Sequence, residues 1–270
     1  MPSTPDLNYI HTFVPAPSDS SRPVTLLLLH GTGGDENSLL SLGNDLWPGA
    51  ALLGLRGKVL ENGMPPSFRR FTEVGIGDVR ARTEELAQFI RAASERYGFS
   101  TRRLIVVGYS NGASLAASLI LLHPHYLAGA ILFRVMMPLV PEIIRDFSHL
   151  SILIGAARLD PLILAGQAEE LAAIFKSGGA DVAISWHHGG RELGEDDVQA
   201  ARNWLARNGF RKGWRHRWRE PVYGFMDRAS SHTERPGCSI KLPPRPGREN
   251  HHGIVLDSAQ GELTDAPMQK

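Results

Sequence analysis

The feature that most constrains this chain is the pentapeptide Gly-Tyr-Ser-Asn-Gly at residues 108–112, because of what lies on either side of it. A short apolar run, 104–107, leads into it, and an alanine-rich apolar stretch, 113–122, follows it. This pattern predicts a strand, a tight turn and a helix. Glycines flank the serine because a strained turn brings strand and helix too close for side chains. We therefore expect the hydroxyl of Ser110 at an open turn apex; a glycine-rich turn without a catalytic role is the plainer alternative.

Strand-like and helix-like segments alternate along most of the chain. The strand-like runs are short and bounded by Gly, Pro or Ser, and they lack the period-two alternation of half-exposed strands. Regular alternation with helical patterns implies right-handed crossovers. The predicted fold class is α/β, a doubly wound, mostly parallel sheet with helices on both faces. We predict strands at 24–29, 51–55, 104–109, 128–133, 151–156 and 182–186, and helices at 78–97, 111–122, 164–176 and 195–207.

Composition narrows the class of partner. The chain has 270 residues, 42% hydrophobic and 21% charged, and its formal net charge is +1. Such a balance gives no global field to attract nucleic acid or a membrane, so we expect a small neutral or mildly polar partner. The single cysteine, Cys238, has no internal partner, and residues 1–11 lack the pattern of a secretory signal, which predicts a cytoplasmic location. The longest apolar stretch, 127–140, is interrupted by Arg134 and is too short to span a bilayer.

The periodicity of apolar residues ends near residue 212. We predict one folded domain over residues 1–211 and a tail, 212–270, that is disordered or loosely docked. A small ordered subdomain is the alternative, because aromatic residues recur early in the tail. The tail also interleaves basic residues with these aromatics at 211–219, which is a weak indication of nucleic-acid or lipid contact in a chain that is neutral as a whole.

A serine hydroxyl is a poor nucleophile at neutral pH, so it needs a base, a group that orients the base, and donors for an oxyanion. The segment His-Gly-Thr-Gly-Gly at residues 30–34 follows a predicted strand, and its glycines permit close approach to a substrate oxygen. We predict that the backbone amides of Thr32 and Asn111 form the oxyanion hole. A phosphate-binding loop is the alternative, but the segment lacks the lysine of a P-loop. We expect His30 to be a structural hydrogen-bonding residue.

The remaining groups should follow later strands. Asp160 comes after the predicted strand 151–156, and the chain order Ser, Asp, His favours it as the acid; an aspartate in a turn before Pro161 is the structural alternative. The base should lie in the loop after the strand 182–186, and that loop reads His-His-Gly-Gly-Arg-Glu-Leu over residues 187–193.

The chain resembles the phospholipase/carboxylesterase group of the α/β-hydrolase superfamily over roughly residues 24–207. The resemblance implies a serine hydrolase that cleaves carboxylic esters or thioesters through an acyl-serine intermediate, without a cofactor and often as a dimer. Residue by residue, it places Ser110 on the nucleophile, Asp160 on the triad acid, and Thr32 and Asn111 on the oxyanion positions. It rests on the segments LLHGTGGDENSLL, LRGKVLENGMP, FRRF, RTEELAQFI, VVGYSNGASLAASLILLHP, GAARLDP and WHHGGRELGEDDVQAARNWL.

The chain departs from the family at the base. Relatives usually carry Gly-Gly-His-Glu-Leu in the last loop, so the histidine of the family aligns with Arg191. Arginine stays protonated and cannot accept a proton. Either His188, with His187 as second choice, or a tail histidine such as His251 or His252 serves as base, or turnover is weak or absent. With weak or absent turnover, the chain would be a ligand-binding protein on a hydrolase scaffold.

A second departure lies at residues 66–70. Relatives tend to have an aromatic pair before the double arginine, whereas this chain reads Pro-Ser-Phe-Arg-Arg. The resemblance places this segment at the acyl or alcohol pocket, which implies an altered specificity. Arg69 and Arg70 are candidates for gripping an anionic group of the substrate, and solvent-facing charges are the plainer interpretation. The expected ligand is a small-molecule ester.

Overall fold

The computed structural model describes residues 7–18, 23–58, 76–163 and 165–208, all of which belong to one compact unit, Met1–Glu220. Within these ranges the strands form a seven-stranded sheet in the order β1-β3-β2-β4-β5-β6-β7. Only β1 runs antiparallel to its neighbour, and the other pairs are parallel. The predicted α/β fold with a mostly parallel sheet is confirmed. The strands are β1 His11–Val14, β2 Thr25–Leu29, β3 Ala51–Leu55, β4 Leu104–Tyr109, β5 Gly129–Phe133, β6 Ser151–Ala157 and β7 Asp181–His187.

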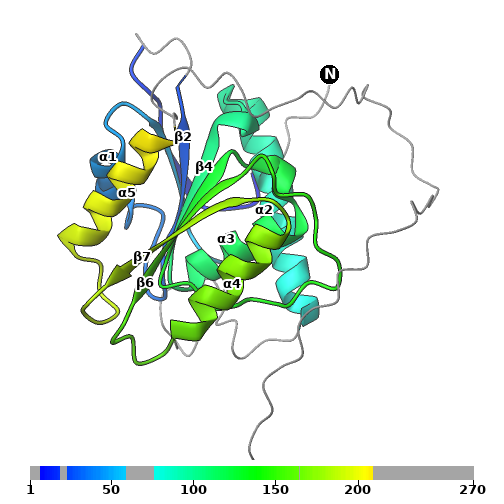
Figure 1. Ribbon diagram of the computed structural model, residues 1–270. Coiled ribbons are helices and arrows are strands. Elements are labelled where there is room, and N and C mark those ends of the chain that lie inside the picture. Colours follow the sequence, from blue (N-terminus) through cyan, green and yellow to red (C-terminus); the bar gives the residue numbers. More distant parts are fainter. Residues whose placement is uncertain (1–6, 19–22, 59–75, 164, 209–270) are drawn as a thin grey trace, which may run out of the picture. The chain divides into compact units, whose positions relative to one another are not determined.

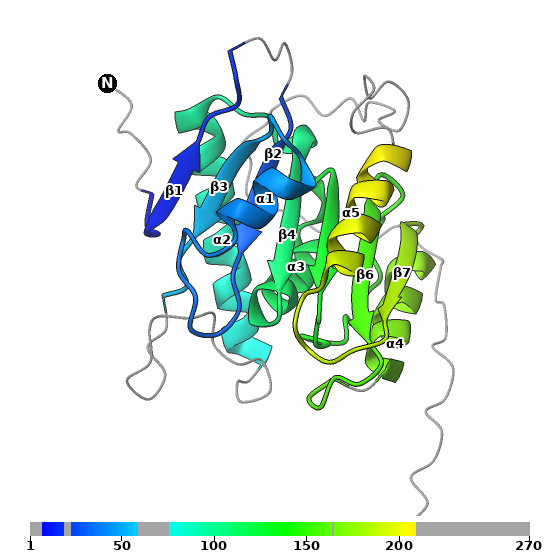
Figure 2. The ribbon, with the colours of Figure 1, turned by 90° about the vertical axis from the view of Figure 1, so that its left-hand side faces the viewer.

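Helices cover both faces of this sheet (Figures 1 and 2). Helices α2, α3 and α4 lie on one face, and α1 and α5 lie on the other. Residues of β4 alternate between the two resulting cores: Leu104 and Val106 pack on the side of α2 and α3, whereas Ile105 and Val107 pack toward α5. Burial on both faces explains why the strands read as continuous apolar runs. The helices are α1 Leu40–Leu46, α2 Ile76–Tyr97, α3 Asn111–Leu122, α4 Ala165–Ser177 and α5 Glu195–Arg207, with short 3-10 turns at Thr101–Arg103 and Pro124–Tyr126.

Two elements escaped prediction, β1 and α1. Strand β1 has four residues and is only partly buried, so its apolar signal is weak. Helix α1 has seven residues with a glycine in the middle and no side chain capping its start. That residue, Gly43, lies where an added Cβ would come within 3.0 Å of Leu28 and Leu52. The glycine that weakens the helical signal is therefore the residue that lets α1 pack closely on the sheet.

The turn between β4 and α3 has the predicted form. Ser110 has φ 56° and ψ −120°, a conformation that L residues rarely adopt. A Cβ on Gly108 would lie 2.5 Å from the Cα of Ala113, and one on Gly112 would lie 2.1 Å from the carbonyl oxygen of Leu29. Both flanking glycines are thus required by close backbone approach, and the serine is held at the carboxyl end of the central strand.

Several predictions from the sequence fall outside the described residues. These concern the tail 212–270 with its aromatic and histidine residues, the boundary at residue 211, and the segment 66–70 with Arg69 and Arg70. Among the helices that are described, none is both long and apolar enough to cross a membrane.

Candidate active site

Ser110 is held by backbone hydrogen bonds on both sides of the turn. Its N–H donates to the carbonyl oxygen of Phe133 at the end of β5, at 2.9 Å, and its own carbonyl accepts from the N–H of Ser114, at 3.0 Å. The residue is 5% exposed and lines an open cavity of about 430 Å³. The turn therefore fixes the hydroxyl at the cavity wall, at a strained backbone position of the kind that clusters at active sites.

The loop after β2 lies against this turn. The amide of the Asn111 side chain donates to the hydroxyl of Thr32 at 2.9 Å, and both residues line the same cavity as Ser110. A Cβ on Gly31 would lie 2.9 Å from the ring of Tyr109, so glycine is needed for this approach. Asn111 is the first residue of α3, where backbone amides point toward the cavity end of the helix. The structure thus brings Thr32 and Asn111 to one side of Ser110.

His30 has the structural role expected of it. Its Nδ1 donates to the carbonyl oxygen of Gly31 at 2.6 Å, and its Nε2 accepts from the N–H of Gly57 at 3.0 Å. The side chain is 2% exposed, and burial lowers its pKa below the ordinary value of 6.5. These contacts join the loop after β2 to the loop after β3, and both ring nitrogens are used in doing so.

Asp160 follows β6, makes the contacts of the turn alternative and also faces Arg191. Its Oδ1 accepts from the backbone N–H groups of Leu162 at 2.9 Å and Ile163 at 3.3 Å, which is the local turn role. Both carboxylate oxygens also face Arg191, and the side chain is only 1% exposed. The carboxylate is therefore fixed by its own turn and directed at the residue that aligns with the histidine of the family.

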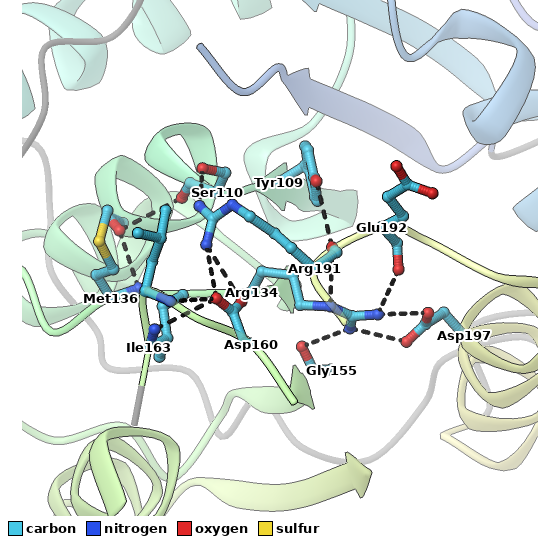
Figure 3. A network of polar contacts seen from close by, with 12 residues as sticks. Tyr109, Ser110, Arg134, Met136, Gly155, Asp160, Ile163, Arg191, Glu192 and Asp197 are labelled. Carbon is cyan, nitrogen blue, oxygen red and sulfur yellow. Dashed lines mark hydrogen bonds and ion pairs between the residues drawn. The ribbon is translucent and has the colours of Figure 1, made fainter. Parts of the chain in front are cut away.

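Arg191 occupies the space between Asp160 and Ser110 (Figure 3). One terminal nitrogen, Nη1, lies 3.2 and 3.1 Å from the two oxygens of Asp160, and the other, Nη2, donates to the hydroxyl oxygen of Ser110. The arrangement has the connectivity of an acid, a middle group and a nucleophile, with a guanidinium in the middle. A guanidinium can donate to both neighbours but cannot take the serine proton.

The histidines considered as alternative bases lie elsewhere in the same loop. His188 is exposed, and in the described ranges no hydrogen bond joins it to Ser110 or Asp160. His187 ends β7, and its Nδ1 is buried without a hydrogen-bond partner among the described residues. Its Nε2 lies toward Gly189, where an added Cβ would be 2.5 Å away. A role for His188 stays a prediction, and it requires the loop to rearrange and Arg191 to leave its place.

Sequence reasoning missed a second arginine at the site. Arg134 follows β5, its side chain is fully buried, and it pairs with Asp197 of α5 at 2.7 Å. It also donates to the carbonyl oxygens of Arg191 and Glu192, at 3.1 and 2.8 Å. The available signal was a lone charge in the apolar stretch 127–140, since a charge in such a run needs a buried partner.

The cavity beside Ser110 has a mixed lining. The polar wall is formed by the serine and by the groups around it, and the apolar contribution comes from Met136, Leu162 and the ring of Tyr109. Leu162 is 66% exposed, so apolar surface reaches the rim. Among the described residues, no group of three or more His, Cys, Asp or Glu side chains is arranged to hold a metal ion. The cavity can admit a ligand that is partly apolar and presents an oxygen to the turn.

Comparison with known proteins defines the class. The model of the dienelactone hydrolase family matches residues 67–191. A carboxylesterase of Bacillus cereus superimposes with a TM-score of 0.70, at 37% identity, over 74% of this chain and 94% of its own. A carboxylesterase from Mesorhizobium loti gives a TM-score of 0.63, at 30% identity, over 71% of this chain and 98% of its own. The fold is therefore that of an α/β-hydrolase.

The relationship is also clear at the level of sequence. The Bacillus subtilis protein MhqD, whose name assigns it to the hydrolases, is 46% identical over 182 residues, which are 66% of this chain and 90% of MhqD. The chain belongs to the esterase group of the α/β-hydrolase superfamily, as its motifs indicated. This membership supports hydrolase chemistry.

Proposed function

We propose that this protein is a carboxylic ester hydrolase with Ser110 as its nucleophile and with slow turnover. The observation that carries the proposal is the placement of the Ser110 hydroxyl, which lies on a strained turn at a cavity wall and receives a hydrogen bond from Arg191. Membership of an esterase group supplies the reaction class. The slow turnover follows from the guanidinium, because positioned general bases typically contribute about 10²–10⁴-fold to rate.

The reaction follows from the groups at hand. The oxygen of Ser110 attacks the ester carbonyl carbon, and its proton passes to solvent. The bond from that carbon to the alcohol oxygen then breaks, and the leaving alkoxide takes up a proton from solvent. The backbone amides of Thr32 and Asn111 are the proposed donors to the carbonyl oxygen as it becomes negative. Water then cleaves the acyl-serine to release the acid. Arg191 adds a positive charge beside the serine oxygen, which favours its ionised form but provides no proton acceptor.

The proposed substrates are small to medium carboxylic esters with an apolar acyl or alcohol part. A cavity of about 430 Å³ has room for such molecules, and Met136, Leu162 and the ring of Tyr109 give its lining an apolar part. We expect the protein to act without a cofactor in the cytoplasm, and homodimer formation remains a prediction from the family resemblance.

A second function has an observation of its own in its favour. Arg191 ties Ser110 to Asp160, so the nucleophile is engaged in a polar bridge. A protein that holds an ester or acid in this cavity without cleaving it would need no base. Ligand binding without turnover is therefore the competing proposal.

Labelling with a fluorophosphonate separates the two functions. If Ser110 is the nucleophile, mass spectrometry should find the adduct on the peptide that carries it, and Ser110→Ala should lose both the adduct and hydrolysis of p-nitrophenyl acetate above background. Labelling of the unaltered chain is expected to be slow. An adduct on another serine, or full activity in Ser110→Ala, would refute the assignment, and a ligand that binds tightly without release of acid would favour the second function.

The pH dependence of hydrolysis identifies the activating group. With Arg191 beside the nucleophile, kcat/KM should rise about tenfold per pH unit between roughly pH 6 and 9, because the reactive form is the small ionised fraction of a hydroxyl. An imidazole base would instead give a plateau above its pKa, near 6.5. A plateau that is lost in His188→Ala would make His188 the base after all.

A further inference from the structure

Arg134 lies between the nucleophile turn and the loop of residue 191. Its backbone follows Phe133, whose carbonyl oxygen accepts from the N–H of Ser110, and its own N–H donates to Gly155 at 2.8 Å. Like Ser110 it has a positive φ, 54°, which is costly for a residue with a side chain. The turn after β5 is therefore hydrogen-bonded to the ends of both β4 and β6. It directs the Arg134 side chain toward the loop that carries residue 191.

The side chain uses all of its donor groups. Nη1 and Nη2 donate to the two oxygens of Asp197 at 2.9 and 2.7 Å, and Nη1 also reaches Gly155 at 3.1 Å. Nε and Nη2 donate to the carbonyl oxygens of residues 191 and 192. The planar guanidinium thus satisfies a carboxylate on one side and two successive backbone carbonyls on the other.

Other contacts converge on the same segment. The hydroxyl of Tyr109 donates to the carbonyl oxygen of Arg191 at 3.2 Å, so the residue before the nucleophile also holds residue 191. Asp197 also accepts from the N–H of Gly194 at 3.0 Å, which holds the far end of the loop at the start of α5. The carbonyl oxygen of residue 191 therefore accepts from both Tyr109 and Arg134, and the guanidinium of Arg134 is held in turn by its buried pair with Asp197.

The geometry assigns Arg134 as the positioning residue that holds residue 191 opposite Ser110 and Asp160. It does not line the cavity beside Ser110, so it acts on the site through the backbone that it holds. Lysine would not substitute, because a single ammonium cannot span a carboxylate and two carbonyls. The assignment rests on the proposed function in one respect only, that residue 191 belongs to the active site.

The test uses the full chain in an Arg191→His background, where the imidazole reports its own position. Beside Asp160, the pKa of that imidazole, followed by NMR, should lie about one unit above 6.5, because a nearby carboxylate favours the charged form. Adding Arg134→Lys should return the pKa toward 6.5 and lower kcat for p-nitrophenyl acetate by about tenfold or more with KM within about twofold, as expected when geometry rather than binding is lost.

Thr83→Val is the control for general destabilisation. The Thr83 hydroxyl is buried between α2 and α3, where it lies 2.7 Å from that of Ser118, away from the loop. This variant should weaken the fold without moving the pKa of the imidazole. If Arg134→Lys does not fold, Arg134→Gln with Asp197→Asn removes both charges together and should show the same shift.

The positioning role of Arg134 and the proposed hydrolase function can fail separately. An imidazole whose pKa and kcat are unchanged by the replacement of Arg134 would overturn the positioning role. An imidazole that titrates as expected in a protein without hydrolysis would support the positioning role and count against the proposed function.

Discussion

Arg191→His is expected to raise kcat for p-nitrophenyl acetate by about 10²-fold or more, since a positioned general base contributes at least that much. The guanidinium already bridges the two groups that a catalytic imidazole would bridge, with Asp160 at 3.1 Å on one side and the hydroxyl of Ser110 on the other. Replacing it removes a group that can only donate and adds one that can accept the serine proton. Initial rates on purified protein, with matched folding by circular dichroism, measure the gain.

Two control variants make the result specific. Arg191→Gln removes the charge without adding a base, so it should not raise kcat. Asp160→Asn in the Arg191→His background should cancel most of the gain, because the imidazole then loses the carboxylate that orients it and stabilises its charged form. A natural chain that already matches Arg191→His, and that loses its activity in His188→Ala, would contradict this account of the site.

Strands β2 to β6 were predictable because they are buried on both faces of the sheet. The predicted runs 51–55 and 104–109 coincide with β3 and β4, and the predicted helices 111–122 and 195–207 coincide with α3 and α5. Short, continuous apolar runs bounded by turn residues such as glycine are typical of buried strands. Strand β1 could not be found in this way, since its half-buried residues carry a weak pattern and its pairing with β3 is a tertiary contact.

The candidate site, too, was predictable only in part. Ser110 and Asp160 each follow a strand, and parallel strands bring such residues to one edge of the sheet, so their convergence was predictable. The sequence also marked residue 191 as anomalous. It gave no means of knowing that the guanidinium reaches both neighbours, because this depends on the length of the side chain and on the course of the loop. Likewise, the partner of Arg134 is 63 residues away, and only the packed structure identifies it.

Asp197→Ala is expected to lower the free energy of unfolding by about 3–5 kcal/mol, because it leaves the guanidinium of Arg134 buried without a counterion. The two side chains are 0% and 1% exposed, so solvent cannot take the place of the carboxylate. The substitution also removes the acceptor of the Gly194 N–H. For a domain of this size the loss corresponds to a melting temperature lower by roughly 10 °C, measurable by thermal denaturation followed by circular dichroism.

Two comparisons show whether the unpaired charge is the cause. Arg134→Met with Asp197→Leu removes both ions together, and it should recover much of the stability, because apolar replacement of a buried pair is often neutral. Glu142→Ala breaks an exposed pair with Arg80, whose side chains are 87% and 49% exposed, and it should leave the melting temperature unchanged. If Asp197→Ala is as stable as the unaltered chain, the buried pair is not what fixes the loop. The double variant can also be combined with Arg191→His. If that protein is stable but lacks the rise in kcat, an apolar pair can replace Arg134 and Asp197 in stabilising the fold but not in positioning residue 191.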